Sequence, residues 1–280
     1  MTSARAVPVL MYHHVSPSGG FITTSPQNFE DQLAWLSRHG YRSLTTNEFA
    51  AHLAGEPVPA RSLMITFDDG YLDNWVYAYP LLKKYGFCAV AFLVTSWMGS
   101  GSVRPYQGRG ELPRVHDHRE CERLIQQGQS DEVALRWSEI HAMQADGTFE
   151  FHSHTHTHTR WDQGSRAESK NELMARELAQ SKEALVANLG TVSQHFCWPQ
   201  GYFDSDYVDL ALQAGFRYLY TTQAFGQNRA GTDPTCIHRF AVRNTSGASV
   251  GRRIRIAANP FVGPLYNHWK LWKRSRRSGA

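Results

Sequence analysis

The chain has 280 residues, with 41% hydrophobic and 19% charged side chains and a formal net charge of +4. This is an ordinary globular composition, long enough for one large α/β domain or two small ones. The longest apolar run, 87–94, is far shorter than the roughly 20 residues that span a bilayer, which argues against a membrane-spanning protein.

The cysteines and the N-terminal sequence indicate the cellular compartment of the protein. The cysteines are Cys88, Cys121, Cys197 and Cys236. They are far apart and form no CxxC motif, so we expect reduced thiols instead of a disulfide framework or a cysteine metal site. The first apolar run is broken by Pro8 and does not have the pattern of a secretory signal peptide. We therefore expect a cytoplasmic protein.

The first part of the chain alternates short apolar runs with amphipathic segments. Ser25 followed by Pro26 is a typical helix start, since serine caps and proline suits the first helical position. The predicted elements are a strand over 7–12, a helix from 26, a strand over 41–44, a helix over 46–53, a buried strand over 63–67, a helix over 75–85 and a buried strand over 88–94.

The segment 98–135 differs from its surroundings. It is rich in Gly, Arg, Gln and charge, and its hydrophobic periodicity is weak. We interpret it as an insertion, which would be a lid, a substrate loop or a disordered excursion.

The alternation of strands and helices resumes after the insertion. The predicted elements are a helix over 136–147, a strand over 149–151, a helix over 166–189, a strand over 195–198, a helix over 206–214, and strands over 218–222 and 237–242. Such alternation predicts parallel βαβ units, and seven or eight of them favour a barrel over an open sheet. We expect an α/β barrel over 1–250, in which functional residues lie at the carboxyl ends of strands.

Two carboxylates and a group of histidines occupy such strand ends. The run Thr66-Phe67-Asp68-Asp69-Gly70 closes a buried strand, and His152, His154, His156 and His158 follow another. Asp68-Asp69 alone could be a solvated turn. A buried strand, however, does not usually end in two uncompensated charges, because ionised carboxylates are costly to desolvate. A cation is therefore expected here.

A metal site is the chemistry that this pattern favours. His154 and His158 are four apart, so a helical turn would bring both imidazoles to one face. Asp69 could be a third ligand, and two histidines with a carboxylate is a common catalytic zinc set, although it also accepts Co²⁺, Ni²⁺ or Fe²⁺. Asp68 would then be free to act as a base. His152 and His156 are left as supporting donors or solvent-facing residues.

Three motifs in this order resemble those of the NodB-homology polysaccharide deacetylases, carbohydrate esterase family four. They are Thr66-Phe67-Asp68-Asp69-Gly70, Ser153-His154-Thr155-His156-Thr157-His158 and Trp198-Pro199-Gln200-Gly201. The opening Val7-Pro8-Val9-Leu10-Met11-Tyr12-His13-His14-Val15 resembles the subgroup that includes poly-N-acetylglucosamine deacetylases. The resemblance covers roughly 7–242 and implies a distorted (β/α)7-type barrel.

The resemblance also implies roles for individual residues in metal-dependent removal of an N-acetyl group from a glycan. Asp68 would be the base, and Asp69, His154 and His158 the metal ligands. The turn Pro199-Gln200-Gly201 would bind substrate, with the backbone N–H of Gln200 helping to hold the oxyanion. His13 would be the general acid.

The chain departs from the family pattern at several positions. Cys197 stands where many members have an arginine two residues before the proline of the third motif, and Gln200 stands where an aromatic residue is common. The late segment Cys236-Ile237-His238-Arg239 resembles the arginine-containing strand of the subgroup. Arg239 and His238 therefore belong to the candidate site, and His238 competes with His13 for the role of acid.

The tail, 251–280, carries eight Lys or Arg and no Asp or Glu. It combines these with aromatic residues such as Phe261, Trp269 and Trp272. A solvated basic end is one interpretation, and peripheral contact with an anionic membrane is the other. Nucleic-acid binding is not expected, because the acidic remainder supplies no basic groove.

We therefore expect a hydrolase that deacetylates an N-acetylated sugar of a cell-envelope glycan or lipid-linked precursor, such as the lipopolysaccharide core. It would act in the cytoplasm or at the inner face of the bacterial inner membrane. The alternatives are a carbohydrate-binding barrel without turnover, which Cys197 and Gln200 motivate, and a metal amidase acting on a formyl or peptide amide.

Overall fold

The computed structural model describes residues 3–163 and 168–278. Its strands are β1 (Val9–Tyr12), β2 (His14–Val15), β3 (Thr23–Thr24), β4 (Arg42–Ser43), β5 (Ser62–Asp69), β6 (Ala89–Leu93), β7 (Phe149–Ser153), β8 (His195–Cys197), β9 (Tyr218–Tyr220) and β10 (Phe240–Ala241). Its α-helices are α1 (Pro26–Arg38), α2 (Thr46–Leu53), α3 (Tyr79–Tyr85), α4 (His118–Gln126), α5 (Trp137–Ala145), α6 (Lys170–Leu189), α7 (Ser205–Gln213), α8 (Gly247–Ala258) and α9 (Val262–Ser278). Shorter turns are η1 (Asn74–Ala78, π), η2 (Ser130–Glu132) and η3 (Pro199–Gly201).

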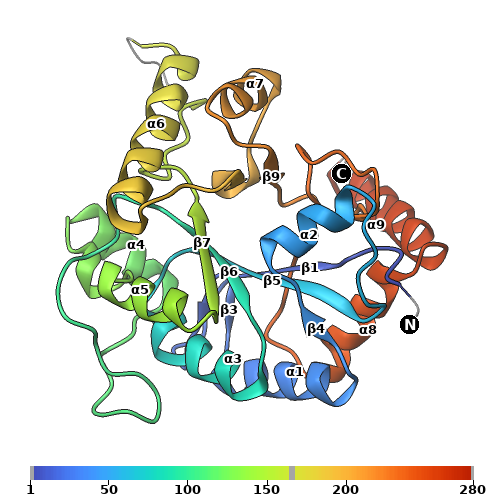
Figure 1. The fold of residues 1–280 in the computed structure, drawn as a ribbon, viewed down its shortest axis with the longest axis horizontal. Coiled ribbons are helices and arrows are strands. Elements are labelled where there is room, and N and C mark those ends of the chain that lie inside the picture. The colour runs from blue at the N-terminus through green and yellow to red at the C-terminus, as the bar shows by residue number, and fades with distance from the viewer. Residues whose placement is uncertain (1–2, 164–167, 279–280) are drawn as a thin grey trace.

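The main sheet is parallel and curled. Its strand order is β10-β1-β5-β6-β7-β8-β9, with β4 added beside β5. An isolated parallel bridge between Tyr220 and Ile237 connects β9 with the segment leading to β10, so the two ends of the sheet approach each other. Helices surround it, with α1 and α3 below, α4 and α5 on the left and α6 and α7 above (Figure 1). The expectation of a single α/β domain of the distorted (β/α)7-barrel type is confirmed.

The first helix begins at the capping residue that the sequence predicts, although some element boundaries differ from the predicted ones. Ser25 caps α1, whose first residue is Pro26, and α6 begins with a capping box at Ser169. The helix predicted over 166–189 starts at Lys170 in the structure, and positions 166 and 167 lie outside the described residues. The helix predicted over 75–85 begins with the wider turn η1. The strand predicted over 237–242 pairs regularly only at β10.

The segment 98–135 is ordered against the barrel. Cys121 and Leu124 of α4 form a small apolar cluster with Tyr71 and Val133. Arg104 donates to both carboxylate oxygens of the buried Glu139 at 2.7 Å, which ties the segment to α5. A disordered excursion is therefore ruled out, and the segment forms a wall beside the carboxyl end of β5.

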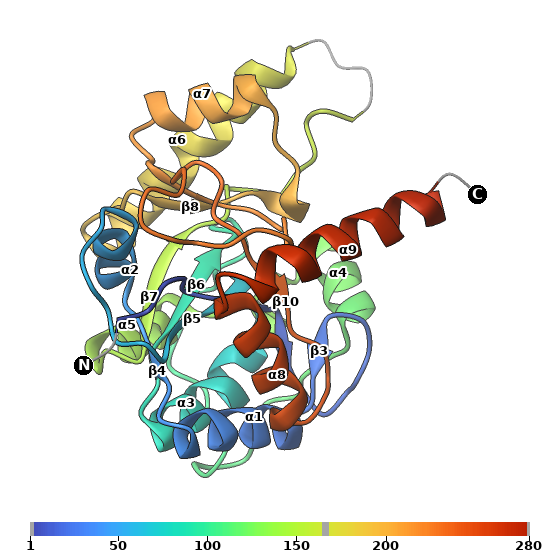
Figure 2. The ribbon, with the colours of Figure 1, turned by 90° about the vertical axis from the view of Figure 1, so that its right-hand side faces the viewer.

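The C-terminal part consists of two helices with different surroundings. α8 packs closely on α1, where an added Cβ at Gly251 would lie 2.2 Å from the Trp35 ring. α9 instead projects from the body with the C-terminus at its far end (Figure 2). No helix within the described residues is both long and apolar enough to cross a bilayer.

Candidate metal centre

Neighbouring parallel strands bring the acidic and histidine motifs to one edge of the sheet. Asp69 ends β5 opposite Leu93 of β6, and Leu93 is opposite Ser153 of β7. His154 follows directly, and its backbone N–H donates to the carbonyl of Leu93 at 2.8 Å. The carboxyl ends of these strands therefore hold Asp69 and His154 side by side.

Asp69, His154 and His158 converge on one point. Oδ1 of Asp69 lies 3.4 Å from Nε2 of His154 and 3.5 Å from Nε2 of His158. This oxygen is buried and has no hydrogen-bond partner within the described residues. An unpartnered buried carboxylate oxygen that faces two imidazole nitrogens fits a divalent cation, and the donor set is one that zinc favours.

The loop after β7 brings the two histidines together without forming a helix. Thr155 and His158 have φ angles of 66° and 64°, which a right-handed helix does not allow. The expected helical turn is therefore wrong. Glu177 of α6 holds the loop by accepting hydrogen bonds from the backbone N–H of His156 and Thr157, at 2.8 and 2.7 Å.

Contacts on the far side of each imidazole orient the ligand atoms. Nδ1–H of His154 donates to the carbonyl of Cys197 at 2.8 Å, which leaves Nε2 facing Asp69. The ring of His158 lies 5.5 Å from the ring of Trp97. Burial lowers the pKa of His158 to about 4, so its imidazole is neutral near neutral pH, as a ligand must be.

Asp68 belongs to a separate ion pair on the other side of the strand. Arg239 donates from Nη1 to Oδ1 at 2.6 Å and from Nη2 to Oδ2 at 2.9 Å. Burial alone would raise the pKa of Asp68, but the charges of Arg239, His154 and His13, together with the hydrogen bonds from Arg239, outweigh burial and hold the pKa below its ordinary value. The carboxylate therefore stays ionised although it is buried.

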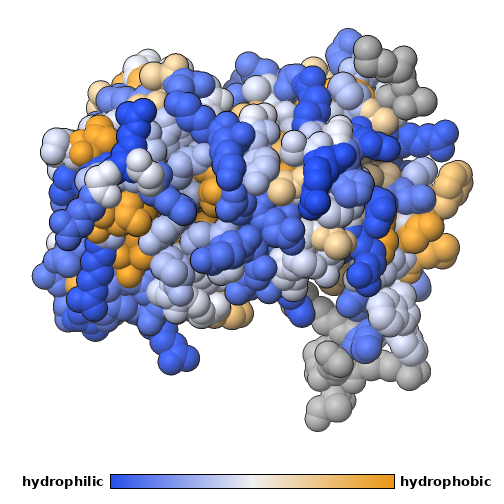
Figure 3. Space-filling view, turned by 90° about the horizontal axis from the view of Figure 1, so that it is seen from below, coloured by the Kyte–Doolittle hydropathy of each residue, from blue (hydrophilic) through white to orange (hydrophobic). Residues whose placement is uncertain are grey.

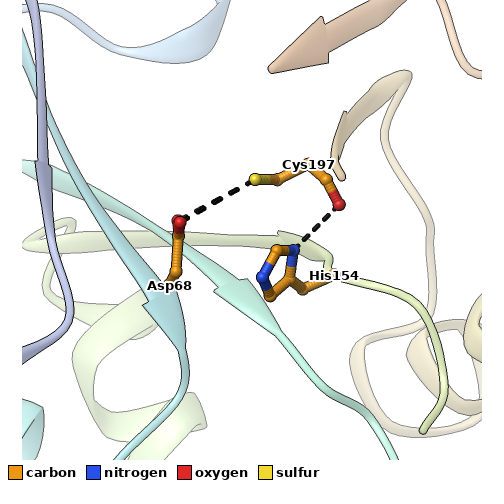
Figure 4. A group of neighbouring side chains, drawn as sticks. All are labelled: Asp68, His154 and Cys197. Carbon is orange, nitrogen blue, oxygen red and sulfur yellow. Dashed lines mark hydrogen bonds between the residues drawn. The ribbon is translucent and has the colours of Figure 1, made fainter. Parts of the chain in front are cut away.

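Cys197 links the two groups. Its Sγ lies 3.9 Å from Oδ1 of Asp68, while its carbonyl accepts from His154 (Figure 4). The same Sγ lies 2.9 Å from Nη2 of Arg239. Asp68, His154 and Cys197 are also close enough to share a metal. The Asp69 group fits a cation better, because Arg239 already neutralises Asp68 and occupies both of its oxygens.

His13 lies beside Asp68, and two residues outside the predicted set fix its backbone. Nε2 of His13 is 3.8 Å from Oδ2 of Asp68. Nδ2 of Asn74 donates to the carbonyl of His13 at 2.8 Å, and Oδ1 of Asp73 accepts from the N–H of Val15 at 3.0 Å. Sequence reasoning missed Asp73 and Asn74, as well as Glu177. Polar residues directly after the Asp-Asp-Gly run were the available signal for the first two.

The remaining predicted residues divide into two sets. Pro199-Gln200-Gly201 forms η3 directly after β8, at the edge that also carries His154, and Gln200 has a left-handed φ of 53°. His238 is not brought to the centre, because it precedes Arg239 in an extended segment and so faces the other way. Its backbone N–H donates to Asn228, and its ring packs on Gly226.

The two histidines left open also lie outside the group of three. Nδ1 of His152 is hydrogen-bonded to Ser193 Oγ at 2.5 Å, and its ring lies near that of His195. Nδ1 of His156 is hydrogen-bonded to Thr95 Oγ1 at 2.9 Å. These contacts anchor the loop and strand on either side of His154.

Comparison with known proteins finds relatives that are all named as deacetylases. A family model described as polysaccharide deacetylase matches residues 55–219. A putative polysaccharide deacetylase of Bacillus subtilis, YxkH, is 36% identical over 137 residues, which cover 46% of this chain and 49% of the relative. A poly-beta-1,6-N-acetyl-D-glucosamine N-deacetylase of Staphylococcus epidermidis is 26% identical, with 72% and 62% covered. The match thus spans half to two thirds of the length of these relatives.

Solved structures agree with the fold. IcaB from Ammonifex degensii superposes with a TM-score of 0.70 at 25% identity, covering 90% of this chain and 98% of that one. The Streptococcus pyogenes deacetylase PplD, in complex with acetate, also gives a TM-score of 0.70, at 21% identity, covering 90% and 99%.

Proposed function

This chain belongs to the polysaccharide deacetylase family, and we propose that it is a metal-dependent hydrolase that removes the N-acetyl group from a sugar of a cell-envelope glycan or its lipid-linked precursor. The observation that carries the proposal is the unpartnered Oδ1 of Asp69 facing the two imidazoles, beside the ionised Asp68. The name of the Staphylococcus epidermidis relative, a poly-beta-1,6-N-acetyl-D-glucosamine N-deacetylase, supports an N-acetylated sugar as substrate. The lipopolysaccharide core is the envelope glycan we would test first.

Asp69, His154 and His158 would hold the cation, for which zinc is the proposed identity and Co²⁺, Ni²⁺ or Fe²⁺ the competitors. When bound, a divalent cation polarises the amide carbonyl and makes water acidic enough for a carboxylate of low pKa to deprotonate it. Asp68 accepts that proton, and Arg239 keeps the carboxylate ionised and in place until then. The turn at Gln200 supplies a backbone N–H to the developing oxyanion.

His13 completes the proposed mechanism as the acid. Burial is the main cause that lowers the pKa of His13, with Asp68 and Asp69 acting against it. The charges of Asp68 and Asp69 favour the imidazolium form, which would give its proton to the departing amine nitrogen. Because Nε2 of His13 lies 3.8 Å from Asp68, base and acid adjoin each other beside the same amide.

The test is release of acetate from N-acetylglucosamine-containing envelope glycans by zinc-loaded protein, with Asp68→Asn as the matched variant. We expect acetate from the wild type and a rate at least about 100-fold lower from the variant, since a positioned general base contributes 10²–10⁴-fold. Formate in place of acetate would identify a deformylase. Glycan binding without either product, with zinc present, would contradict the proposal and favour a binding barrel.

We further propose that α9 lies on the anionic inner face of the bacterial inner membrane. Val262, Leu265, Trp269 and Trp272 recur at helical spacing and are exposed, Leu265 by 73%. Apolar residues also gather at the edge of the molecule on the side of α8 and α9 (Figure 3). The basic residues of 251–280 would add about 1 kcal/mol each near an anionic surface.

Sedimentation with vesicles tests the membrane contact. We expect binding to phosphatidylglycerol vesicles and little to phosphatidylcholine, and loss of binding in a Leu265→Ser, Trp269→Ser variant.

We also propose that the protein is cytoplasmic, which the unpaired state of all four cysteines supports. Fractionation of cells that make the protein would check it, and recovery from the periplasm would overturn it.

A further inference from the structure

A cavity of about 430 Å³ lies beside the last strand of the sheet, away from the carboxylate–histidine group. It is enclosed by β10 and the residues after it, by 224–225, and by α8 and α9. Its polar lining is dominated by Arg243, Arg253 and Lys270, and no Asp or Glu lines it. The cavity therefore has a strongly positive character.

Arg253 is the unusual group in this cavity. Nη2 donates to the carbonyl of Ala224 at 3.0 Å, and the guanidinium lies 4.8 Å from the ring centres of both Phe240 and Tyr266. Nη1 is shielded from solvent and has no hydrogen-bond partner within the described residues. Burial lowers the pKa of Arg253, a sign that no carboxylate compensates its charge.

Arg253 differs from two other arginines of the protein that are removed from solvent, because those two form ion pairs. Arg239 is buried and Arg104 is, like Arg253, partly buried, and each of these two has a bidentate carboxylate partner. In the part of the chain that the structure describes, no carboxylate lies within ion-pair distance of Arg253, Arg243 or Lys270. A partly buried cation whose shielded N–H groups have no counter-charge is costly, and a bound anion would supply that counter-charge.

The cavity extends past the carboxyl end of β10, since residues 242, 243 and 245 are part of its lining. β10 pairs in parallel with β1, and the N–H of Val242 donates to the carbonyl of Met11 at 3.0 Å. The next residues along the two strands are Arg243 and, after Tyr12, His13. Arg243, which lines the cavity, therefore follows β10 at about the same level as the proposed acid follows β1.

We propose that this cavity is a subsite for a phosphate group carried by the substrate, which rests on the proposed deacetylase function. Arginine presents a planar array of N–H donors that suits phosphate oxygens, and Arg243 and Lys270 add charge on two other sides. A phosphorylated sugar, as a lipid-linked precursor contains, would place its phosphate here while its acetamido group reaches Asp69. The geometry also directs the lipid toward α9, because Tyr266 and Lys270 of that helix line the cavity.

The test compares N-acetylglucosamine 1-phosphate with N-acetylglucosamine as ligands of the zinc-loaded full-length protein, by calorimetry and ³¹P NMR. We expect the phosphate to improve affinity, and Arg253→Gln to weaken binding of the phosphorylated sugar about tenfold, the loss of one charge-assisted hydrogen bond. Lys270→Gln, on a half-exposed side chain, should weaken it several-fold. Arg252→Gln is the matched control, since Arg252 is exposed on the same helix and does not line the cavity.

Several results would overturn the proposal. Equal affinity in wild type, Arg253→Gln and Lys270→Gln, with all three folded by circular dichroism, would exclude a phosphate subsite. Unchanged affinity for the soluble sugar phosphate, with loss of binding to phosphatidylglycerol vesicles, would assign the cavity to a lipid headgroup instead. Because affinity and acetate release are separate measurements, a protein that binds the phosphate but releases no acetate would refute the deacetylase and leave the subsite standing.

Discussion

Asp68 and Asp69 are neighbours in the chain, yet their side chains enter two separate groups. Successive residues of a strand point to opposite faces, and Asp69 adds a left-handed φ of 77° at the strand end. Asp68 meets a permanent cation, Arg239, whereas Asp69 meets two imidazoles and keeps one oxygen unpartnered. The two carboxylates are thus suited to different roles, one as a base and one as a ligand.

At the residue scale, the position of His13 depends on Asn74. Replacing Asn74 with Ala removes the 2.8 Å hydrogen bond to the carbonyl of His13. We expect kcat for acetate release to fall about tenfold with KM little changed, and the free energy of unfolding to fall by about 1–2 kcal/mol, because a buried acceptor loses its donor. Bound zinc, measured by metal analysis, should stay the same. Zinc loss in parallel with kcat would contradict a role through His13.

At the scale of elements, the loop after β7 owes its shape to a helix that is distant in sequence. Thr155 and His158 have left-handed backbone angles that local preference disfavours. The buried Glu177 of α6 accepts two backbone N–H groups of this loop and the hydroxyl of Thr157. The loop and α6 therefore act together to present His154 and His158.

We expect Glu177→Gln to weaken zinc binding about tenfold or more, a typical effect of residues that support metal ligands. Glutamine keeps one acceptor oxygen but replaces the other with a donor, which faces N–H or O–H groups that also donate. Competition with a chromogenic chelator measures the affinity. Glu183→Gln, on an exposed position of the same helix, is the control, and equal zinc affinity in the two variants would show that Glu177 has no such role.

The contact between α1 and α8 gives a second prediction at this scale. A Cβ on Gly251 would lie 2.2 Å from the Trp35 ring, so the ring or the helix must move. We expect Gly251→Ala to lower the free energy of unfolding by about 1–3 kcal/mol, the range for overpacking, even though alanine is the better helix former. Urea denaturation measures this. A stabilised Gly251→Ala protein would show that α8 is not packed on α1 in this way.

At the scale of the whole molecule, the curl of the sheet assembles the centre. Arg239 and Asp68 are 171 positions apart in the chain, and they meet because β10 pairs with β1 and β1 with β5. The same closure places His13, which follows β1, beside Asp68. The assembly of the proposed catalytic residues therefore depends on the closure of the entire sheet.

Metal binding should stabilise this assembly as a whole. At zinc 100-fold above its dissociation constant, the free energy of unfolding should rise by about 2.7 kcal/mol over chelator-treated protein. Asp69→Asn should abolish this increase in thermal or urea denaturation, since asparagine fits the left-handed backbone at this position but removes the anionic ligand. The same increase in the wild type and in Asp69→Asn would place the zinc elsewhere.

The sequence by itself determined much of the fold and the composition of the centre. Alternating apolar runs and capped helices predict parallel βα units, because burial and capping are local patterns. The two carboxylates at a strand end and the spaced histidines predict a metal site, because a buried charge requires a partner. The tertiary contacts of these residues could not be predicted in the same way, because no local sequence pattern connects Asp68 with Arg239 or the histidine loop with Glu177.

Tertiary structure decided the rest. It separated Arg239 from His238 by pointing adjacent residues to opposite faces, and it replaced the expected helical turn by a left-handed loop held from α6. It also divided the basic tail into a helix packed on the barrel and a projecting helix, leaving Arg253 partly buried with no carboxylate partner among the described residues. These outcomes depend on which distant segments meet in space, and that is set by the closure of the sheet and not by any short run of residues.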